Sequence, residues 1–184
     1  MLNYWFKNCI ELAVRFWEQF FPKEIETMKY IPLTPESIEL LKKQLEPTMN
    51  ERFLKICLDA LDTDPSTPDA VKDELGCANT LSVLIKKLYP DFPIIVSTKD
   101  LDWKLWQDKR FKRITEPEIG AIIISPRTNT QFGHCGVWIT SEKIASNNSR
   151  TGLWQGNYSW SSWIQEFKIN RKLPIYIYQL LDNF

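Results

Sequence analysis

The sequence predicts an α+β fold in which a helical N-terminal part packs on a small antiparallel sheet. Of the 184 residues, 43% are hydrophobic and 13% are aromatic, which is enough apolar material for a core. Apolar residues recur at helical spacing in the first half of the chain, whereas short apolar segments bounded by turn residues follow position 118. We expect an N-terminal helix and linker over residues 1–30 and one domain over 31–184, with a helical lead-in at 34–64 and its core at 66–184.

Composition excludes several classes of function. The 23 Lys and Arg residues balance the 23 Asp and Glu residues, so we expect no binding to nucleic acid through bulk charge. The four cysteines form no CxxC pair, which favours free thiols over a disulfide scaffold. The single histidine, His134, excludes a Cys2His2 zinc site and a histidine-rich metal site. We therefore expect no metal and no cofactor.

Residues 1–21 are expected to form an amphipathic helix, because their apolar side chains recur every three or four positions. This helix would pack on the domain or on a second copy of the chain. Alternatively it would make peripheral contact with a membrane surface, since tryptophan and phenylalanine favour that depth. Glu11 and Arg15 interrupt the apolar run, so we expect synthesis in the cytoplasm without a cleaved signal peptide.

Four further helices are expected between residues 34 and 88. Thr34 and Pro35 are typical of a helix start, and this helix would end at Pro47. A second helix is expected from about Asn50 to Leu61, a short one over 67–75, and a longer one from Cys77 to Leu88.

The second half should contain the strands. A helix with a charged end is expected over 99–113, followed by strands at 118–125, 133–140 and 143–149. A helix over 159–167 and a closing strand over 173–180 complete the predicted order. Three short antiparallel strands that follow a helix are typical of an α+β arrangement.

Cys77 is a candidate nucleophile because it falls in the first turn of the expected 77–88 helix. Unpaired backbone N–H groups and the positive end of the helix dipole lower the pKa of a thiol there, and the thiolate is the reactive form. The alternative interpretation is a small buried core residue, which is the common fate of a free cysteine.

His134 and the asparagines that follow give Cys77 possible partners. His134 lies on one predicted strand, and the next strand ends in Asn147 and Asn148. Thiol hydrolases of the papain type need an imidazole beside the sulfur and a third polar group that orients the imidazole. Side chains alternate along a strand, so only one of the two asparagines faces His134. Asn147 is favoured over Asn148, and Ser146 is a third option.

Three blocks of sequence resemble the CHAP and NlpC-type cysteine peptidases, and more narrowly the phage-type and bacterial cell-wall hydrolases of that superfamily. The blocks are residues 73–78, 133–137 and 144–154, and the likeness covers roughly residues 66–180. It implies a papain-like fold and a peptidoglycan endopeptidase or N-acetylmuramoyl-L-alanine amidase that acts at the cell wall as a phage lysin or virion-associated protein. Cys77 would be the nucleophile, with its own backbone N–H as an oxyanion donor, and His134 the general base.

The sequence departs from this family at two positions. Cys135 follows the histidine where an aliphatic residue is expected, and Ala121 stands where an acidic residue is common. Cys135 would point to the face opposite His134, as a buried core thiol.

Aromatic residues are candidates for the substrate side of the cleft, because aromatic faces can line a site for sugars and short peptides. Polar loop residues flank Trp103 and Trp154, which are therefore expected to bind substrate. Trp160 and Trp163 are expected to pack on the sheet.

Two other functions stay open at this point. The same scaffold could act on another amide or on a thioester, or the chain could be a non-catalytic binding protein.

Overall fold

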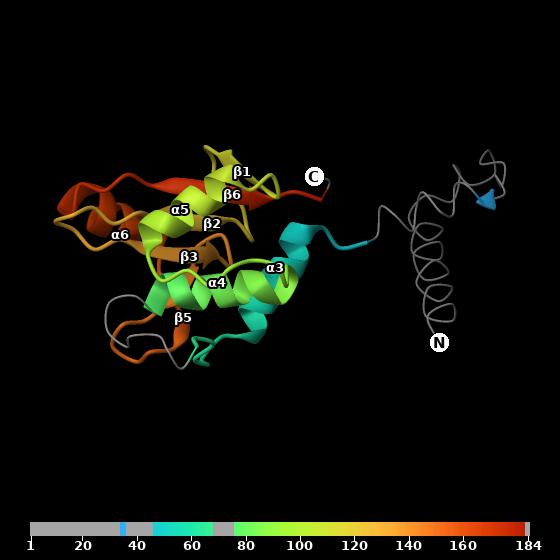
Figure 1. Ribbon diagram of the computed structural model, residues 1–184, viewed down its shortest axis with the longest axis horizontal. Helices are drawn as coiled ribbons and strands as arrows, with labels where there is room; N and C mark the ends of the chain where they lie inside the picture. The colour runs from blue at the N-terminus through green and yellow to red at the C-terminus, as the bar shows by residue number, and fades with distance from the viewer. Residues whose placement is uncertain (1–33, 36–45, 68–75, 183–184) are drawn as a thin grey trace, which may run out of the picture. The chain divides into compact units, whose positions relative to one another are not determined.

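The computed structural model describes residues 34–35, 46–67 and 76–182 (Figure 1). The chain divides between Glu46 and Pro47, and the helices and strands that follow belong to the second unit, residues 47–184. The expected helices at 1–21 and 67–75, most of the 34–47 helix, the boundary near residue 30 and the thiol of Cys9 lie outside the described residues. None of the described helices is long and apolar enough to cross a membrane.

Within the described residues, three α-helices precede the first strand: α3 (Met49–Asp59), α4 (Gly76–Leu88) and α5 (Thr98–Gln107). Helix α3 begins with a capping box, in which the Thr48 hydroxyl accepts from the Glu51 N–H and the Glu51 carboxylate accepts from the Thr48 N–H. The Ser97 side chain caps α5. Helices α3 and α4 agree with the helices that were expected to begin at about Asn50 and at Cys77.

Six strands form one antiparallel sheet in the order β1-β6-β2-β3-β4-β5. Their bounds are β1 (Phe111–Ile114), β2 (Ile122–Ser125), β3 (His134–Trp138), β4 (Ile144–Asn147), β5 (Trp154–Tyr158) and β6 (Tyr176–Leu180). The three central strands and the closing strand were expected, and the fold is a mixture of helices with an antiparallel sheet, as predicted.

The two edge strands were not expected from the sequence. Strand β5 contains Gly156 and Asn157, which are poor strand formers, and it occurs because β4 offers an open edge. Strand β1 lies in the region predicted to continue the 99–113 helix. That helix instead ends at Gln107, and Asp108 turns to an extended backbone.

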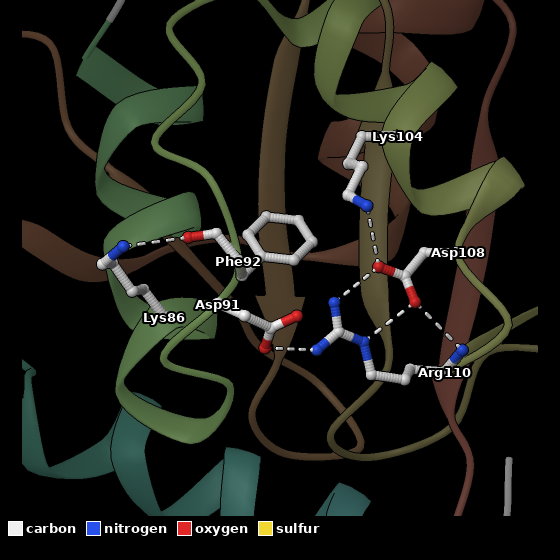
Figure 2. A network of polar contacts seen from close by, with 6 residues as sticks. All are labelled: Lys86, Asp91, Phe92, Lys104, Asp108 and Arg110. Atoms are coloured by element: carbon white, nitrogen blue, oxygen red, sulfur yellow. Dashed lines mark hydrogen bonds and ion pairs between the residues drawn. The ribbon is translucent and has the colours of Figure 1, made fainter.

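A charged network fixes this turn between α5 and β1 (Figure 2). Asp108 accepts from Arg110 at 2.7 Å and pairs with Lys104 at 3.1 Å, and Arg110 also pairs with Asp91 at 2.7 Å. The Arg110 guanidinium holds the pKa of the Asp108 carboxyl well below its usual range. Four ionic groups therefore join the loop after α4, the end of α5 and the start of β1.

The sheet buries side chains on both faces. On one face α4 packs against β3 and β4, in a cluster that includes Cys77, Cys135 and Ala145. On the other face a short helix, α6 (Trp160–Trp163), and a π-helix over Ile164–Asn170 cover a second cluster that includes Trp138, Trp163 and Phe167. The predicted 159–167 helix therefore extends to residue 170, and its second part has π geometry.

Candidate active site

A pocket of about 530 Å³ opens where the first turn of α4 meets the start of β3 and the end of β4. Cys77, His134 and Asn147 all line it, together with the residues just after β4 and the end of β5. The fold therefore brings together a thiol and an imidazole that are separated by more than fifty positions in the sequence.

Cys77 is the second residue of α4, and its side chain is only 6% exposed. Its pKa lies well below the usual value for a thiol. A side-chain hydrogen bond with Cys135 lowers it most, burial opposes this, and the charge of His134 and a hydrogen bond with His134 lower it further. These neighbours thus favour the thiolate form of Cys77 over the thiol.

Cys135 lies on the face of β3 that packs against α4, opposite to His134, as strand alternation predicts. Its thiol is fully buried, but it is more than a core residue because it contacts the Cys77 sulfur. Burial and the neighbouring Cys77 raise the pKa of Cys135, which favours its protonated S–H form. No pattern in the sequence predicts this contact.

His134 is the first residue of β3 and is held between aromatic rings. Its ring centroid lies 5.5 Å from those of Trp163 and Phe167, both in stacked geometry, and 5.6 Å from that of Tyr158. Packing against these rings restricts the orientation of the imidazole plane, independently of its hydrogen bonds.

The hydrogen bond to His134 comes from Ser146, whose Oγ lies 3.0 Å from Nε2. The Ser146 hydroxyl donates its only proton to Asn157 Oδ1, at 2.7 Å. Ser146 must therefore accept from an Nε2–H, and Nδ1 is the ring nitrogen that Ser146 does not contact. The Ser146–Asn157 pair thus orients the imidazole through Nε2.

The two predicted asparagines bond elsewhere. Asn147 is 8% exposed and donates to Gly152 O at 3.1 Å and to Thr80 Oγ1 at 3.4 Å, so it joins α4 to the loop after β4. Asn148 donates to Gln155 Oε1 at 2.9 Å. Gly136 pairs with Ser146, and residues two apart share a face, so His134 and Ser146 face one way and Asn147 the other.

The two predicted substrate-binding tryptophans do not line the pocket. Trp154 is 0% exposed, and its Nε1 donates to Cys57 O at 3.1 Å within the core. It begins β5 rather than a loop, which is why the expectation of exposure differs from the structure. Trp103 is 56% exposed on α5 but contacts Trp106, with ring centroids 5.1 Å apart.

Gly133 lets the chain pass close to β2 immediately before His134. A Cβ at this position would lie 2.2 Å from Ser125 O and 2.4 Å from Arg127 N, both backbone atoms. Gly133→Ala is therefore expected to lower the free energy of unfolding by about 1–3 kcal/mol, because the backbone must move. Urea denaturation followed by circular dichroism measures this.

Gly156→Ala is the matched control, since its added Cβ would meet only the flexible side chains of Ile139, at 3.3 Å, and Lys143, at 3.7 Å. Equal stability of the two variants would contradict the close approach at Gly133.

Comparison with known proteins leaves the family open. No protein-family model matches the chain. No curated protein matches it either. One chain of the crystal structure of the type VI native effector–immunity complex Tae3–Tai3 from Ralstonia pickettii is similar with a TM-score of 0.46 and 16% identity, over 73% of this chain and 99% of that chain. A similarity of this size identifies no family.

Proposed function

We propose that this protein is a thiol-dependent amide hydrolase that cleaves peptidoglycan at the cell wall. The chemistry is supported by two side chains that line one pocket. The pKa of the Cys77 thiol, at the N-terminus of α4, is lowered, and the neighbouring His134 is hydrogen-bonded to Ser146 through Nε2. Peptidoglycan as the substrate rests on the resemblance of residues 66–180 to the CHAP and NlpC-type peptidases.

The proposed reaction has two halves. The Cys77 thiolate attacks the carbonyl carbon of the amide, His134 gives a proton to the leaving amine, and a thioester forms. His134 then takes a proton from water, the hydroxide attacks the thioester, and the product leaves as a carboxylic acid. The Cys77 backbone N–H lies in the first turn of α4, where N–H groups lack a partner within the helix, and it stabilises the oxyanion in both halves.

Ser146 and Asn157 are the proposed positioning residues for His134, in place of Asn147 or Asn148. Asn147 has a different proposed task. A Cβ built at Gly76 would lie 3.2 Å from Asn147 Oδ1, so this amide lies against the start of α4 and keeps the thiol-bearing turn in place.

The direct test is incubation of the protein with purified peptidoglycan, followed by mass spectrometry of the released fragments. The proposal requires fragments in which one amide has become a free amine and a free carboxyl group. Hydrolysis of another amide or a thioester, with peptidoglycan left intact, would keep the thiol chemistry and overturn the substrate. No hydrolysis of any of these, with Cys77 unreactive, would favour a binding protein.

Reactivity of the thiols tests the electrostatics of the site without a substrate. Cys77 is expected to react with iodoacetamide well below about pH 8, whereas Cys9, Cys57 and Cys135 should lag. The two described thiols lag for a physical reason, because burial raises the pKa of both Cys57 and Cys135. Mass spectrometry of each alkylated cysteine against pH gives the titration midpoints.

Cys135→Ala should move the Cys77 midpoint to higher pH, because the largest stabilising contact of the thiolate is lost. Cys135→Ser should restore much of the shift, since the hydroxyl still donates. Cys57→Ala is the matched control and should leave the midpoint unchanged. Equal alkylation rates for all four cysteines would contradict the activated thiol.

A further inference from the structure

The charged side chains that line the pocket indicate which chemical group a substrate must present to it. Two arginines, Arg150 and Arg171, line it, and no acidic residue does within the described part of the chain. A cationic pocket of this kind favours an anionic ligand.

Arg171 is already neutralised. Its Nε donates to Glu166 Oε1 at 2.8 Å, its Nη2 contacts the same carboxylate, and its Nη1 donates to Phe132 O at 3.0 Å. The pKa of Glu166 is lowered chiefly by Arg171, as expected for an ion pair that holds its charge. This arginine therefore joins the π-helix to the segment before β3 and brings little net charge to a ligand.

Arg150 makes no such pair. The interaction it makes among the described residues is through its backbone N–H, which donates to Asn148 Oδ1 at 3.0 Å, and its side chain is exposed. The Arg150 guanidinium is thus the cation of the pocket with no acidic partner in the described part of the chain.

The loop that carries Arg150 has a defined shape. Asn148 N–H donates to Leu153 O at 2.8 Å, and Gly152 N–H donates to Asn148 O at 2.7 Å. The Asn148 side chain in turn donates a hydrogen bond from Nδ2 to Gln155 Oε1 of β5, at 2.9 Å. The backbone that carries the Arg150 side chain is therefore fixed next to the Asn147 side of the pocket, and its exposed end can reach a ligand there.

We propose that Arg150 binds a carboxylate of the substrate, next to the amide that is cleaved. A guanidinium presents two parallel N–H donors that match the two oxygens of a carboxylate. This assignment of Arg150 rests on the proposed function. It defines the substrate class as stem peptides that carry a free carboxylate beside the scissile bond, in preference to those in which that group is a carboxamide.

Binding to the Cys77→Ala protein tests this inference without turnover. The ligands are a matched pair of muropeptides, one with the free α-carboxyl group of its isoglutamate residue and one with that group amidated. Isothermal titration calorimetry is expected to show about tenfold tighter binding of the acid, the size of one charge-assisted contact at a partly exposed site. Adding Arg150→Gln should remove the difference between the ligands, and Arg150→Lys should keep part of it.

Lys112→Gln is the matched control, because it removes the same charge from β1, outside the pocket, and should leave the preference intact. A preference for the acid that survives Arg150→Gln would overturn the inference, and so would equal binding or no binding of the two ligands by the protein that keeps Arg150. The proposed function fails in a different way, when the wild-type protein leaves intact a muropeptide that the Cys77→Ala protein binds.

Discussion

Replacing Cys77 with alanine is expected to reduce peptidoglycan hydrolysis by more than about 10⁴-fold, because no other group in the pocket can form the thioester. The substitution removes only a sulfur from a nearly buried position in the first turn of α4. Release of soluble fragments from purified peptidoglycan, measured against protein of equal concentration, gives the rate.

Two controls separate lost chemistry from lost structure. Circular dichroism and thermal unfolding should show that the Cys77→Ala protein is folded. Cys57→Ala removes a fully buried sulfur from α3, outside the pocket, and should leave the rate of fragment release close to that of the wild type. Wild-type activity in the Cys77→Ala protein would end the proposal that this thiol is the nucleophile.

Replacing His134 with alanine is expected to cost about as much as the loss of Cys77, since a thiolate–imidazolium pair acts as a unit. The loss has two causes. The proton of the leaving amine has no donor, and the charge that lowers the pKa of Cys77 disappears. Fragment release gives the first effect, and the pH dependence of Cys77 alkylation, shifted to higher pH, gives the second.

Graded variants test how His134 is positioned. Ser146→Ala should lower the rate by about 10–100-fold, as expected for removal of a group that orients a catalytic side chain, and Ser146→Thr should restore part of it because the hydroxyl remains. The matched comparison is Asn148→Ala, which leaves the Ser146 contact intact. If Asn148→Ala lost as much activity as His134→Ala while Ser146→Ala stayed active, the assignment of Ser146 would be wrong.

The helices and the central strands were predicted well from the sequence, because each depends on a residue pattern within its own segment. The apolar spacing over residues 50–61, the apolar spacing after Cys77 and the short apolar strand after Gly120 need no knowledge of the rest of the chain. The two edge strands were not predicted, because each depends on a neighbouring strand and not on a local pattern. Phe111–Ile114 follows a helix and carries two cations, and it becomes a strand only because β6 lies beside it.

Burial of individual aromatic residues was predicted less reliably. Polar neighbours suggested an exposed Trp154, but its ring enters the core beneath α3 and bonds to Cys57 O. Flanking residues report the exposure of a loop, and this tryptophan begins a strand whose side chains alternate between core and solvent. Trp163, by contrast, packs on the sheet as expected.

The sequence by itself determined that a cysteine opens a helix and that the lone histidine starts a strand between two glycines. Tertiary structure alone decided which groups meet them. The register of β3 against β4 pairs Gly136 with Ser146 and so sets a serine, not an asparagine, beside the imidazole. Packing of α4 on β3 likewise brings Cys135 to the Cys77 sulfur. Both outcomes depend on contacts between segments far apart in the chain, which hydrophobic periodicity within one segment does not encode.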